Sequence, residues 1–419
     1  MKPAHKRLVN LVKLAAVAAL ILYVASNVQW RDTLTVRGAD GTVAREAQGA
    51  IRGSWEGDTV RFAARQADGT LAAEDDVRTG PRPDGTQVYV SPGFLTYLRN
   101  LDVGLFLLAA LCTLFTMTVA ATRWWWLLRV NRLAVGFWEA QRFTWIGMFF
   151  NNLVPGGTGG DLIKAVYIMK HCPGGRVPAL VSVIVDRVMG LGSLAVLAAV
   201  VVLFHLDRFG RLAIAIWAVV LGVCLLGVVA FSRRLRDWTG LKWLLARLPA
   251  SLQSPLQRID QAVFFYRGHT AGMALWTLIG IGNHVVSVAC VLILGEALNV
   301  GLPAADYFVL IPIANIVTAV PIAPNGWGVG EFLYRYLFGT YGAVHLTAVV
   351  DPVRVMGTRG VALSVLYRIQ VTLLSFLGGL LVLLEKDRVS AKDLAAEAEI
   401  EAAEARGGEA GRDSTPPVR

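Results

Sequence analysis

The chain carries few charged residues for its length. Of its 419 residues, only 17% are Asp, Glu, Lys or Arg, whereas 55% are hydrophobic. A soluble globular domain carries roughly 25% charged residues, so this chain has too little polar surface to cover a water-facing body of its size. The shortage argues against a soluble protein. It predicts a helical membrane protein, because apolar stretches of about 20 residues can cross the ~30 Å of hydrocarbon in a bilayer.

Cysteines and the motifs of soluble enzymes are also scarce. The four cysteines lie in or beside apolar stretches, with no paired spacing for zinc or redox chemistry. There is no Walker loop, dinucleotide-binding fingerprint, zinc-protease motif or nucleophile elbow. We therefore expect no cofactor and no metal, and we do not expect the chain to be an enzyme.

The net charge of +10 could indicate nucleic-acid binding, but the positions of the basic residues argue against it. They flank the apolar stretches, as in Lys2, Lys6 and Arg7, in Arg123, Arg129 and Arg132, and in Arg233, Arg234 and Arg236. This is the positive-inside pattern of cytoplasmic loops. It predicts a multi-pass protein of the cell inner (cytoplasmic) membrane with both termini in the cytoplasm and no nucleic-acid partner.

Six apolar stretches are long enough to be full spans. They cover residues 8–28, 103–128, 179–204, 212–231, 271–298 and 361–384. Residues 1–28 are interpreted as a retained anchor, because no signal-peptide cleavage site follows the first stretch. The second stretch ends in Arg123-Trp124-Trp125-Trp126, a composition typical of the headgroup interface. The tail, residues 386–419, has the charged, Ala/Glu-rich composition of a disordered segment.

Residues 29–100 have a different composition and are predicted to form a small β-rich insertion outside the membrane. The segment is polar and repeats an Asp-Gly-Thr turn signal at residues 40–42, 68–70 and 84–86. Asp-Gly between short alternating runs is a strong hairpin signal. A long loop of this kind is exported largely regardless of its charge, and it could contact an envelope protein.

Two further apolar segments, 133–177 and 303–345, are interrupted by Pro and Gly and are expected to be re-entrant helical hairpins. Each contains an Asn-bearing apolar run, then a turn, then an acidic residue opening another helix. The turn residues are Pro155, Gly156, Gly157 and Gly159 in the first segment, and Pro321, Pro324, Gly326, Gly328 and Gly330 in the second. Matched broken segments in the two halves of a chain indicate a transporter's binding site. The alternative is an ordinary pair of helix-connecting loops.

Charged residues inside the predicted spans include Asp186, Arg187 and Arg368. Such residues cost ~2.5–3.5 kcal/mol each on insertion scales and usually face a partner or a cavity. Asp186 and Arg187 are adjacent and point in different directions on a helix, so each requires a partner elsewhere. Arg368 is expected to pair with Asp186 or Glu331. These charges could hold helices together or could handle substrate.

Taken together in their order along the chain, the motifs of these segments resemble the flippase-like transmembrane family that also forms the membrane half of lysylphosphatidylglycerol synthases. The resemblance covers residues 100–385. It rests on five motifs: Asn152-x-x-Pro155, Gly159-Gly160-Asp161-x-x-Lys164, Asp186-Arg187, Pro324-x-Gly326-x-Gly328-Val329-Gly330-Glu331, and Tyr367-Arg368. Family members often have Arg where Lys164 stands, and the β-rich insertion is unusual. Because only a short tail follows residue 384, we do not expect the soluble aminoacyl-transferase domain of the synthases.

The resemblance implies an all-α polytopic membrane protein with about six full spans and two re-entrant hairpins, in which residues 101–385 form the flippase-like domain. It implies movement of lipids between leaflets, of anionic, polyprenyl or hopanoid type. The substrate-binding residues carried over are Asn152, Gly160, Asp161, Lys164, Asp186, Arg187, Glu331 and Arg368. Two alternatives stay open: a membrane-embedded transferase with Asp161 or Glu331 as base, and a scaffold that anchors the insertion near an envelope machine.

Overall fold

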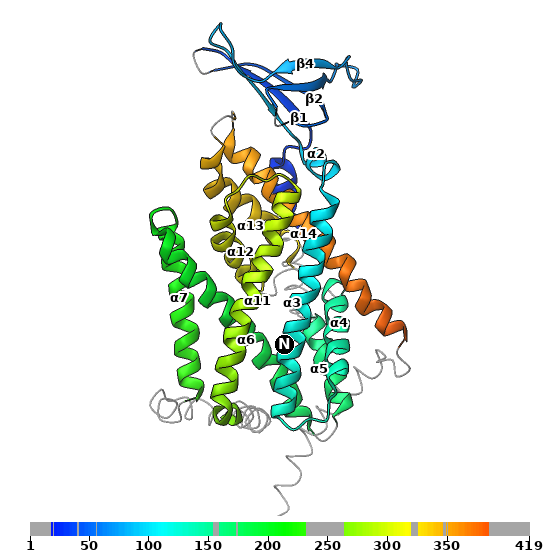
Figure 1. Cartoon of the computed structure of the whole chain (residues 1–419), viewed down its shortest axis with the longest axis vertical. Helices are drawn as coiled ribbons and strands as arrows, with labels where there is room; N and C mark the ends of the chain where they lie inside the picture. The colour runs from blue at the N-terminus through cyan, green and yellow to red at the C-terminus, as the bar shows by residue number, and fades with distance from the viewer. Residues whose placement is uncertain are drawn as a thin grey trace, which may run out of the picture. The chain divides into compact units, whose positions relative to one another are not determined.

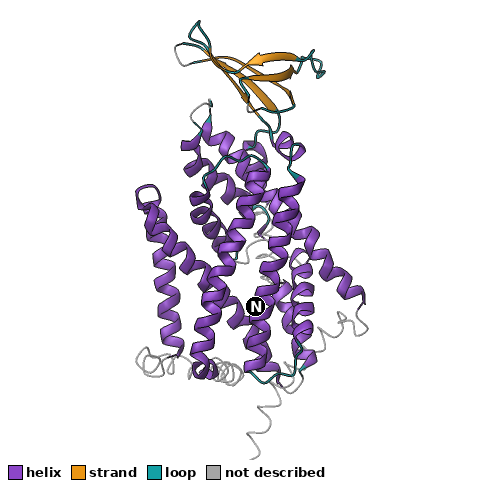
Figure 2. Ribbon diagram, viewed as in Figure 1, coloured by secondary structure: helices purple, strands orange, loops and turns teal. Residues whose placement is uncertain are grey.

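The computed structural model describes residues 18–384 apart from 20, 40–41, 56, 154–158, 173–174, 232–263, 320–325, 347–348 and 350. The described chain is mostly helical and carries one antiparallel sheet (Figure 2), which confirms the predicted fold at this level. It divides into two compact units. The first comprises the described residues within Met1–Phe115 and Val285–Leu373, and the second those within Thr116–Val154, Thr158–His284 and Leu374–Arg419.

Among the described residues, four helical stretches are long and apolar enough to cross a membrane. They are Val103–Val130, Arg176–Gly222, Tyr266–Ala297 and Pro352–Leu384. Figure 1 labels their helices as α3 (Val103–Val130), α6 (Arg176–Val202), α7 (Leu206–Phe231), α11 (Thr270–Ala297) and α14 (Pro352–Leu384). The 47-residue stretch contains both α6 and the start of α7, joined by the 3-10 turn η2 (Leu203–His205). The total of six spans stays a prediction, and the predicted span 8–28 lies largely outside the described residues.

Helix α14 begins nine residues earlier than the apolar stretch 361–384 predicts. Pro352 occupies its first position, where the missing N–H costs nothing, and the Asp351 carboxylate accepts the Arg354 backbone N–H at 3.0 Å. Two arginines, Arg354 and Arg359, lower the hydropathy of this first part, so apolar length alone does not predict it. The additional turns carry Thr358, which accepts the Gln29 backbone N–H at 3.1 Å, and Arg359, which donates to the Tyr97 hydroxyl at 2.9 Å.

The insertion folds as a six-stranded antiparallel sheet in the order β4-β3-β2-β1-β6-β5. Its strands are β1 (Asp32–Arg37), β2 (Val43–Arg52), β3 (Thr59–Ala64), β4 (Asp75–Arg78), β5 (Gly80–Pro81) and β6 (Gln87–Ser91). Alternating residues of β2 and β3 place Ile51, Val60 and Phe62 on one buried face. The free edge of β4 reads Asp75-Asp76-Val77-Arg78, and charged residues at an edge discourage pairing with another chain.

Two of the three Asp-Gly-Thr signals make turns of one design. Gly69 and Gly85 adopt positive φ values of 86° and 78°, which favour glycine. In each turn the preceding aspartate accepts hydrogen bonds from the backbone N–H (2.9 Å) and the hydroxyl (2.6 Å) of the following threonine. The turn at 84–86 joins β5 to β6. The third signal contains residues 40–41, which lie outside the described part.

The sheet is fixed to its own unit by polar contacts. The buried Asp32 carboxylate accepts the backbone N–H groups of Ile51 (2.6 Å) and Gly93 (2.7 Å), so it joins β2 to the start of helix α2 (Phe94–Arg99). Arg359 of α14 donates to the Tyr97 hydroxyl at 2.9 Å and to the Val300 carbonyl at 2.8 Å. Both contacts lie inside the first unit.

Each unit contains one broken helical hairpin. In the second unit, α4 (Phe137–Leu153) and α5 (Gly159–His171) pack together. In the first unit, α12 (Ala304–Thr318) packs against α13 (Val329–Leu337), which continues into the π-helical turn η5 (Phe338–Gly342) and the 3-10 turn η6 (Ala343–His345). These helices of 9 to 17 residues are shorter than the ~20 residues a full span requires.

Candidate functional site

Helices α4 and α5 of the second unit run antiparallel in close contact. Toward the ends of the helices that lie away from the turn, His171 and Glu139 lie 3.5 Å apart, and the rings of Phe143 and Tyr167 lie 5.6 Å apart. At the turn, the Gly160 backbone N–H donates to the Asn151 side-chain oxygen at 2.7 Å. A Cβ on Gly160 would stand 1.9 Å from the Gly147 carbonyl oxygen. Gly160 is therefore required for the two backbones to approach.

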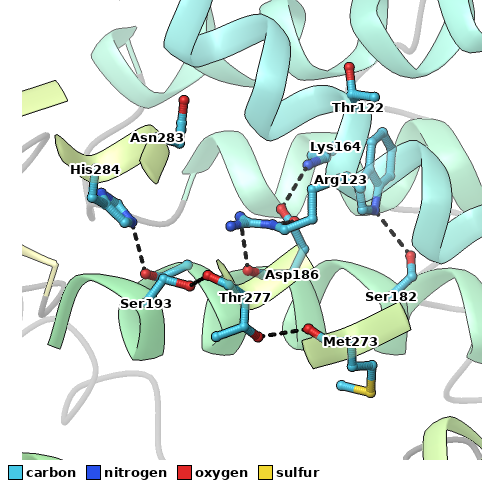
Figure 3. A network of polar contacts seen from close by, with 12 residues as sticks. Thr122, Arg123, Lys164, Ser182, Asp186, Ser193, Met273, Thr277, Asn283 and His284 are labelled. Carbon is cyan, nitrogen blue, oxygen red and sulfur yellow. Dashed lines mark hydrogen bonds and ion pairs between the residues drawn. The ribbon is translucent and has the colours of Figure 1, made fainter. Parts of the chain in front are cut away.

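This hairpin brings Lys164 to a buried ionic cluster. The Asp186 carboxylate of α6 contacts Arg123 Nε of α3 at 2.8 Å through one oxygen and Lys164 Nζ of α5 at 3.6 Å through the other. Figure 3 shows the two cations approaching Asp186 from different helices. The exposed fractions are only 8% for Arg123 and 6% for Lys164. Two cations thus share one carboxylate in the interior of the second unit.

An aromatic ring supports the lysine. The Lys164 ammonium lies 3.8 Å from the ring centre of Trp124, close enough for a cation–π interaction. Trp124 is fully buried, and its indole N–H donates to the Ser182 hydroxyl at 3.1 Å. The placement of the Arg123–Trp126 run at the headgroup interface stays a prediction, but neighbouring helices bury the side chains of Arg123 and Trp124.

A second ion pair lies beside this cluster and is more exposed. Arg187 of α6 pairs with Asp161 in the first turn of α5, and about a third of each side chain is exposed. Asp161 and Lys164 are three residues apart on α5, and their partners Arg187 and Asp186 are adjacent on α6. The predicted shared face of Asp161 and Lys164 is therefore the face that meets α6.

The cluster around Asp186 and the Asp161–Arg187 pair together contain more cations than carboxylates. Among the described residues they contain three cations (Arg123, Lys164 and Arg187) and two carboxylates (Asp161 and Asp186). Two cations that share one carboxylate in a site of low dielectric attract a further anion strongly. A lipid phosphate or another single negative charge would balance this set. Within the described ranges, no group of three His, Cys, Asp or Glu side chains could hold a metal ion.

The second hairpin carries a charge pair of a different character, entirely within the first unit. Glu331 of α13 forms an ion pair with Arg368 of α14, and both side chains are about nine-tenths buried. The other Glu331 oxygen accepts the Gly328 backbone N–H at 2.6 Å, and the Ser364 hydroxyl lies 3.4 Å from the first. Glu331 therefore caps its own helix and neutralises Arg368.

Glycines shape the surroundings of Arg368. Its guanidinium donates to the Gly326 carbonyl at 2.8 Å and lies 5.0 Å from the centre of the Trp327 ring. Gly326 and Gly328 have positive φ values of 69° and 79°, and a Cβ on Gly330 would stand 2.1 Å from an Arg368 nitrogen. The glycine-rich sequence here is what lets the backbone wrap around the arginine.

The structure brings most of the sequence-predicted site residues together, but in two groups. Asp161, Lys164, Asp186 and Arg187 gather in the second unit, and Glu331 and Arg368 in the first. Asp186 and Arg187 each have the separate partner that their adjacent positions require, and of the two partners expected for Arg368 the structure shows Glu331. Asn152 donates to the Met148 carbonyl of its own helix at 3.2 Å. Pro155, Gly156, Gly157, Pro321 and Pro324 lie outside the described residues.

Sequence reasoning missed three residues of the site. Arg123 was counted with the surface arginines, Trp124 with the interface tryptophans, and Asn151 was overlooked beside Asn152. The only available signal for Arg123 was its position before three tryptophans at the end of an apolar run. Burial of that position depends on neighbouring helices, which a single-sequence reading does not provide.

Comparisons with known proteins identify the family of the chain. The family described as the lysylphosphatidylglycerol synthase TM region matches residues 93–350, more than half of the chain. A UPF0104 membrane protein of Pyrococcus horikoshii is 29% identical over 140 residues, which cover 32% of this chain and 42% of that protein. The matched part is thus under half the length of this relative. The family match includes both hairpins and α6, and it ends before α14, so it contains every residue of the cluster around Asp186.

Proposed function

The chain belongs to the lysylphosphatidylglycerol synthase TM region family, and from this premise we propose that it moves a phosphate-bearing or other anionic lipid between the leaflets of a membrane. It is a multi-pass membrane protein, and we place it in the inner (cytoplasmic) membrane. The alternative with most support from its family is a membrane-embedded transferase acting on a lipid headgroup.

The observation that carries the proposal is the buried excess of positive charge in the second unit. Arg123 and Lys164 share one carboxylate, and the neighbouring Asp161–Arg187 pair is balanced. Keeping a charged group inside a membrane protein is costly. A site that retains one cation more than it needs for structure is suited to receive an anion during its working cycle.

The geometry around Lys164 supports a headgroup site near the start of α5. Helix N-termini favour anions, because their N–H groups and the helix dipole point toward the ligand. Lys164 lies one turn after Asp161, and the partly exposed Asp161–Arg187 pair lies next to the buried lysine. We propose that a lipid phosphate replaces Asp186 as the partner of Lys164, while Asp161 and Arg187 line its approach.

The contacts of Glu331 give it a different role in this proposal. Its two oxygens are occupied by Arg368, Ser364 and the Gly328 N–H, so we assign it to closing the second hairpin rather than to binding lipid. That Glu331 marks an outer mouth of the path stays a prediction. As a base for a transferase, Glu331 would have to leave its buried arginine, which argues against the enzymatic alternative.

Reconstitution tests the proposal directly. Full-length protein in liposomes should transfer a fluorescently labelled phosphatidylglycerol between leaflets, as measured by dithionite accessibility, and Lys164→Gln should slow the transfer about tenfold or more, since one charge-assisted contact is worth roughly 1.5–3 kcal/mol. Lys170→Gln, on the same helix but outside the cluster, serves as the matched control.

The alternatives give different outcomes in the same vesicles. A transferase would alter the headgroup chemically, which thin-layer chromatography of the recovered lipid would show. A scaffold would neither transfer the lipid between leaflets nor alter its headgroup. Unchanged transfer by a stable Lys164→Gln protein would contradict the site, and no transfer by the wild-type protein for any anionic lipid tested would contradict the function.

A further inference from the structure

Arg123 is enclosed by glycines from two helices of the second unit. A Cβ added to Gly190 of α6 would stand 3.1 Å from one guanidinium nitrogen. A Cβ added to Gly280 of α11 would stand 2.6 Å from the Ser193 hydroxyl and 3.5 Å from the other guanidinium nitrogen. Gly192 and Gly282, two residues further along the same helices, have nothing within 4 Å of such a Cβ. Gly190 therefore makes room for the guanidinium itself, whereas Gly280 makes room mainly for Ser193.

The same arginine holds Asp186 at two points. Its Nε donates to the carboxylate at 2.8 Å, and one terminal nitrogen donates to the Asp186 backbone carbonyl at 3.2 Å. A guanidinium presents donors in a fixed planar fork, so these contacts fix both the side chain and the backbone of Asp186. Lys164 reaches the remaining carboxylate oxygen only at 3.6 Å, which is beyond a normal hydrogen bond.

The consequence is a lysine that is oriented but incompletely neutralised. Trp124 holds its ammonium from one side at 3.8 Å, and Ser182 fixes Trp124. If Arg123 did not hold the carboxylate, Asp186 could close onto Lys164 and form a tight neutral pair. A neutral pair would have no charge to offer an anionic headgroup.

We infer that Arg123 is a positioning residue that keeps Asp186 from neutralising Lys164 and so leaves Lys164 available to the phosphate of an anionic lipid. The inference rests on the proposed lipid-binding function of the same cluster. It adds Arg123 and the neighbouring Gly190 to that function. Arg123 acts through Asp186 and has no contact with the lipid.

A double-variant experiment separates positioning from plain structural support. Full-length protein in detergent is titrated with fluorescent phosphatidylglycerol. Arg123→Gln should weaken binding about tenfold or more, because Asp186 closes onto Lys164 and a charge-assisted contact worth roughly 1.5–3 kcal/mol is lost. Arg123→Gln combined with Asp186→Asn should recover most of the affinity, since a neutral amide at position 186 cannot neutralise Lys164. A structural arginine would give a double variant no better than the single one.

Gly190 supplies a second test, with Gly192 as the matched control. Gly190→Ala should displace the end of the Arg123 side chain and weaken phosphatidylglycerol binding severalfold, whereas Gly192→Ala should leave binding unchanged. Thermal unfolding is measured on each variant, and the comparison is made among variants that unfold like the wild type.

Different results would contradict the lipid-binding function and the positioning role of Arg123. Absence of phosphatidylglycerol binding by the wild-type protein would contradict the proposed function itself. Wild-type binding together with a double variant as weak as Arg123→Gln would overturn the positioning role of Arg123 alone. The same conclusion would follow if Gly190→Ala and Gly192→Ala bound equally well.

Discussion

The two hairpins differ in how their buried charges are compensated. Glu331 and Arg368 neutralise each other and are both about nine-tenths buried. Lys164 and Arg123 compete for Asp186, and the adjacent Asp161–Arg187 pair is partly exposed. The same residue types thus serve hairpin closure in one place and present a spare cation in the other.

The closed pair predicts a strong effect on stability. Arg368→Gln should lower the free energy of unfolding by about 3–5 kcal/mol, because it leaves the Glu331 carboxylate buried without its partner. Adding Glu331→Gln should restore part of the loss, as measured by thermal unfolding in detergent.

The partly exposed pair provides the comparison for Arg368. Arg187→Gln should cost about 1 kcal/mol or less in the same assay, because exposed pairs contribute little.

Strictly additive losses for Arg368→Gln and Glu331→Gln would show that the two residues are not coupled, against the contact seen here.

At the scale of elements, the first hairpin depends on a close approach of α4 and α5. Gly160→Ala would place a Cβ 1.9 Å from the Gly147 carbonyl oxygen, and overpacking of this kind costs about 1–3 kcal/mol or more. We expect a lower unfolding temperature and weaker lipid transfer. Gly282→Ala, a helical position with open space around it, should not destabilise the protein. An unfolding temperature for Gly160→Ala equal to that of Gly282→Ala would contradict the tight hairpin.

The turns of the sheet predict a local dependence on pH. The pKa of Asp84 is lowered from its ordinary value, mainly by the hydrogen bond from the Thr86 hydroxyl, and the Thr70 hydroxyl lowers the pKa of Asp68 in the same way. A lowered pKa in the folded state means that this contribution is complete above the unfolded-state pKa of about 3.9 and is lost as the pH falls through the folded value.

Each threonine can be removed independently to test this. Thr86→Val should raise the pKa of Asp84 toward its ordinary value and leave that of Asp68 unchanged, as followed by NMR titration of the carboxyl groups. Thr70→Val should do the reverse. An Asp84 pKa that does not move in Thr86→Val would show that the hydroxyl contact is not formed in solution.

At the scale of the whole molecule, the arrangement across the membrane is a prediction from charge alone. Residues 29–100 are expected outside and both termini inside. On a background without the native cysteines, a cysteine in place of Asp68 should react with an impermeant maleimide in intact cells, and one in place of Ser414 should react only after lysis. The opposite labelling pattern would invert the topology.

The sequence by itself determined the membrane class, the β-rich insertion and the existence of two broken helices. Each of these depends on a local signal: apolar length for α3 and α11, the Asp-Gly-Thr repeat for the turns at Gly69 and Gly85, and Pro/Gly clusters for the hairpins. Local signals are readable because backbone preference and hydrophobic length act within a few residues. The early start of α14 at Pro352 was missed because its arginines mask an otherwise good helix start.

Only the tertiary structure decided which charges meet. The sequence left Asp186 or Glu331 as partners for Arg368, and it placed Arg123 and Trp124 at the membrane surface. Packing of α3, α5 and α6 buried both residues and gave Asp186 two cations, while the positive φ values at Gly326 and Gly328 let Glu331 cap α13 and meet Arg368. A charge buried away from water must be compensated within a few ångströms, and the available partners lie tens of residues away in the chain. The fold therefore fixes the pairs that the sequence can only suggest.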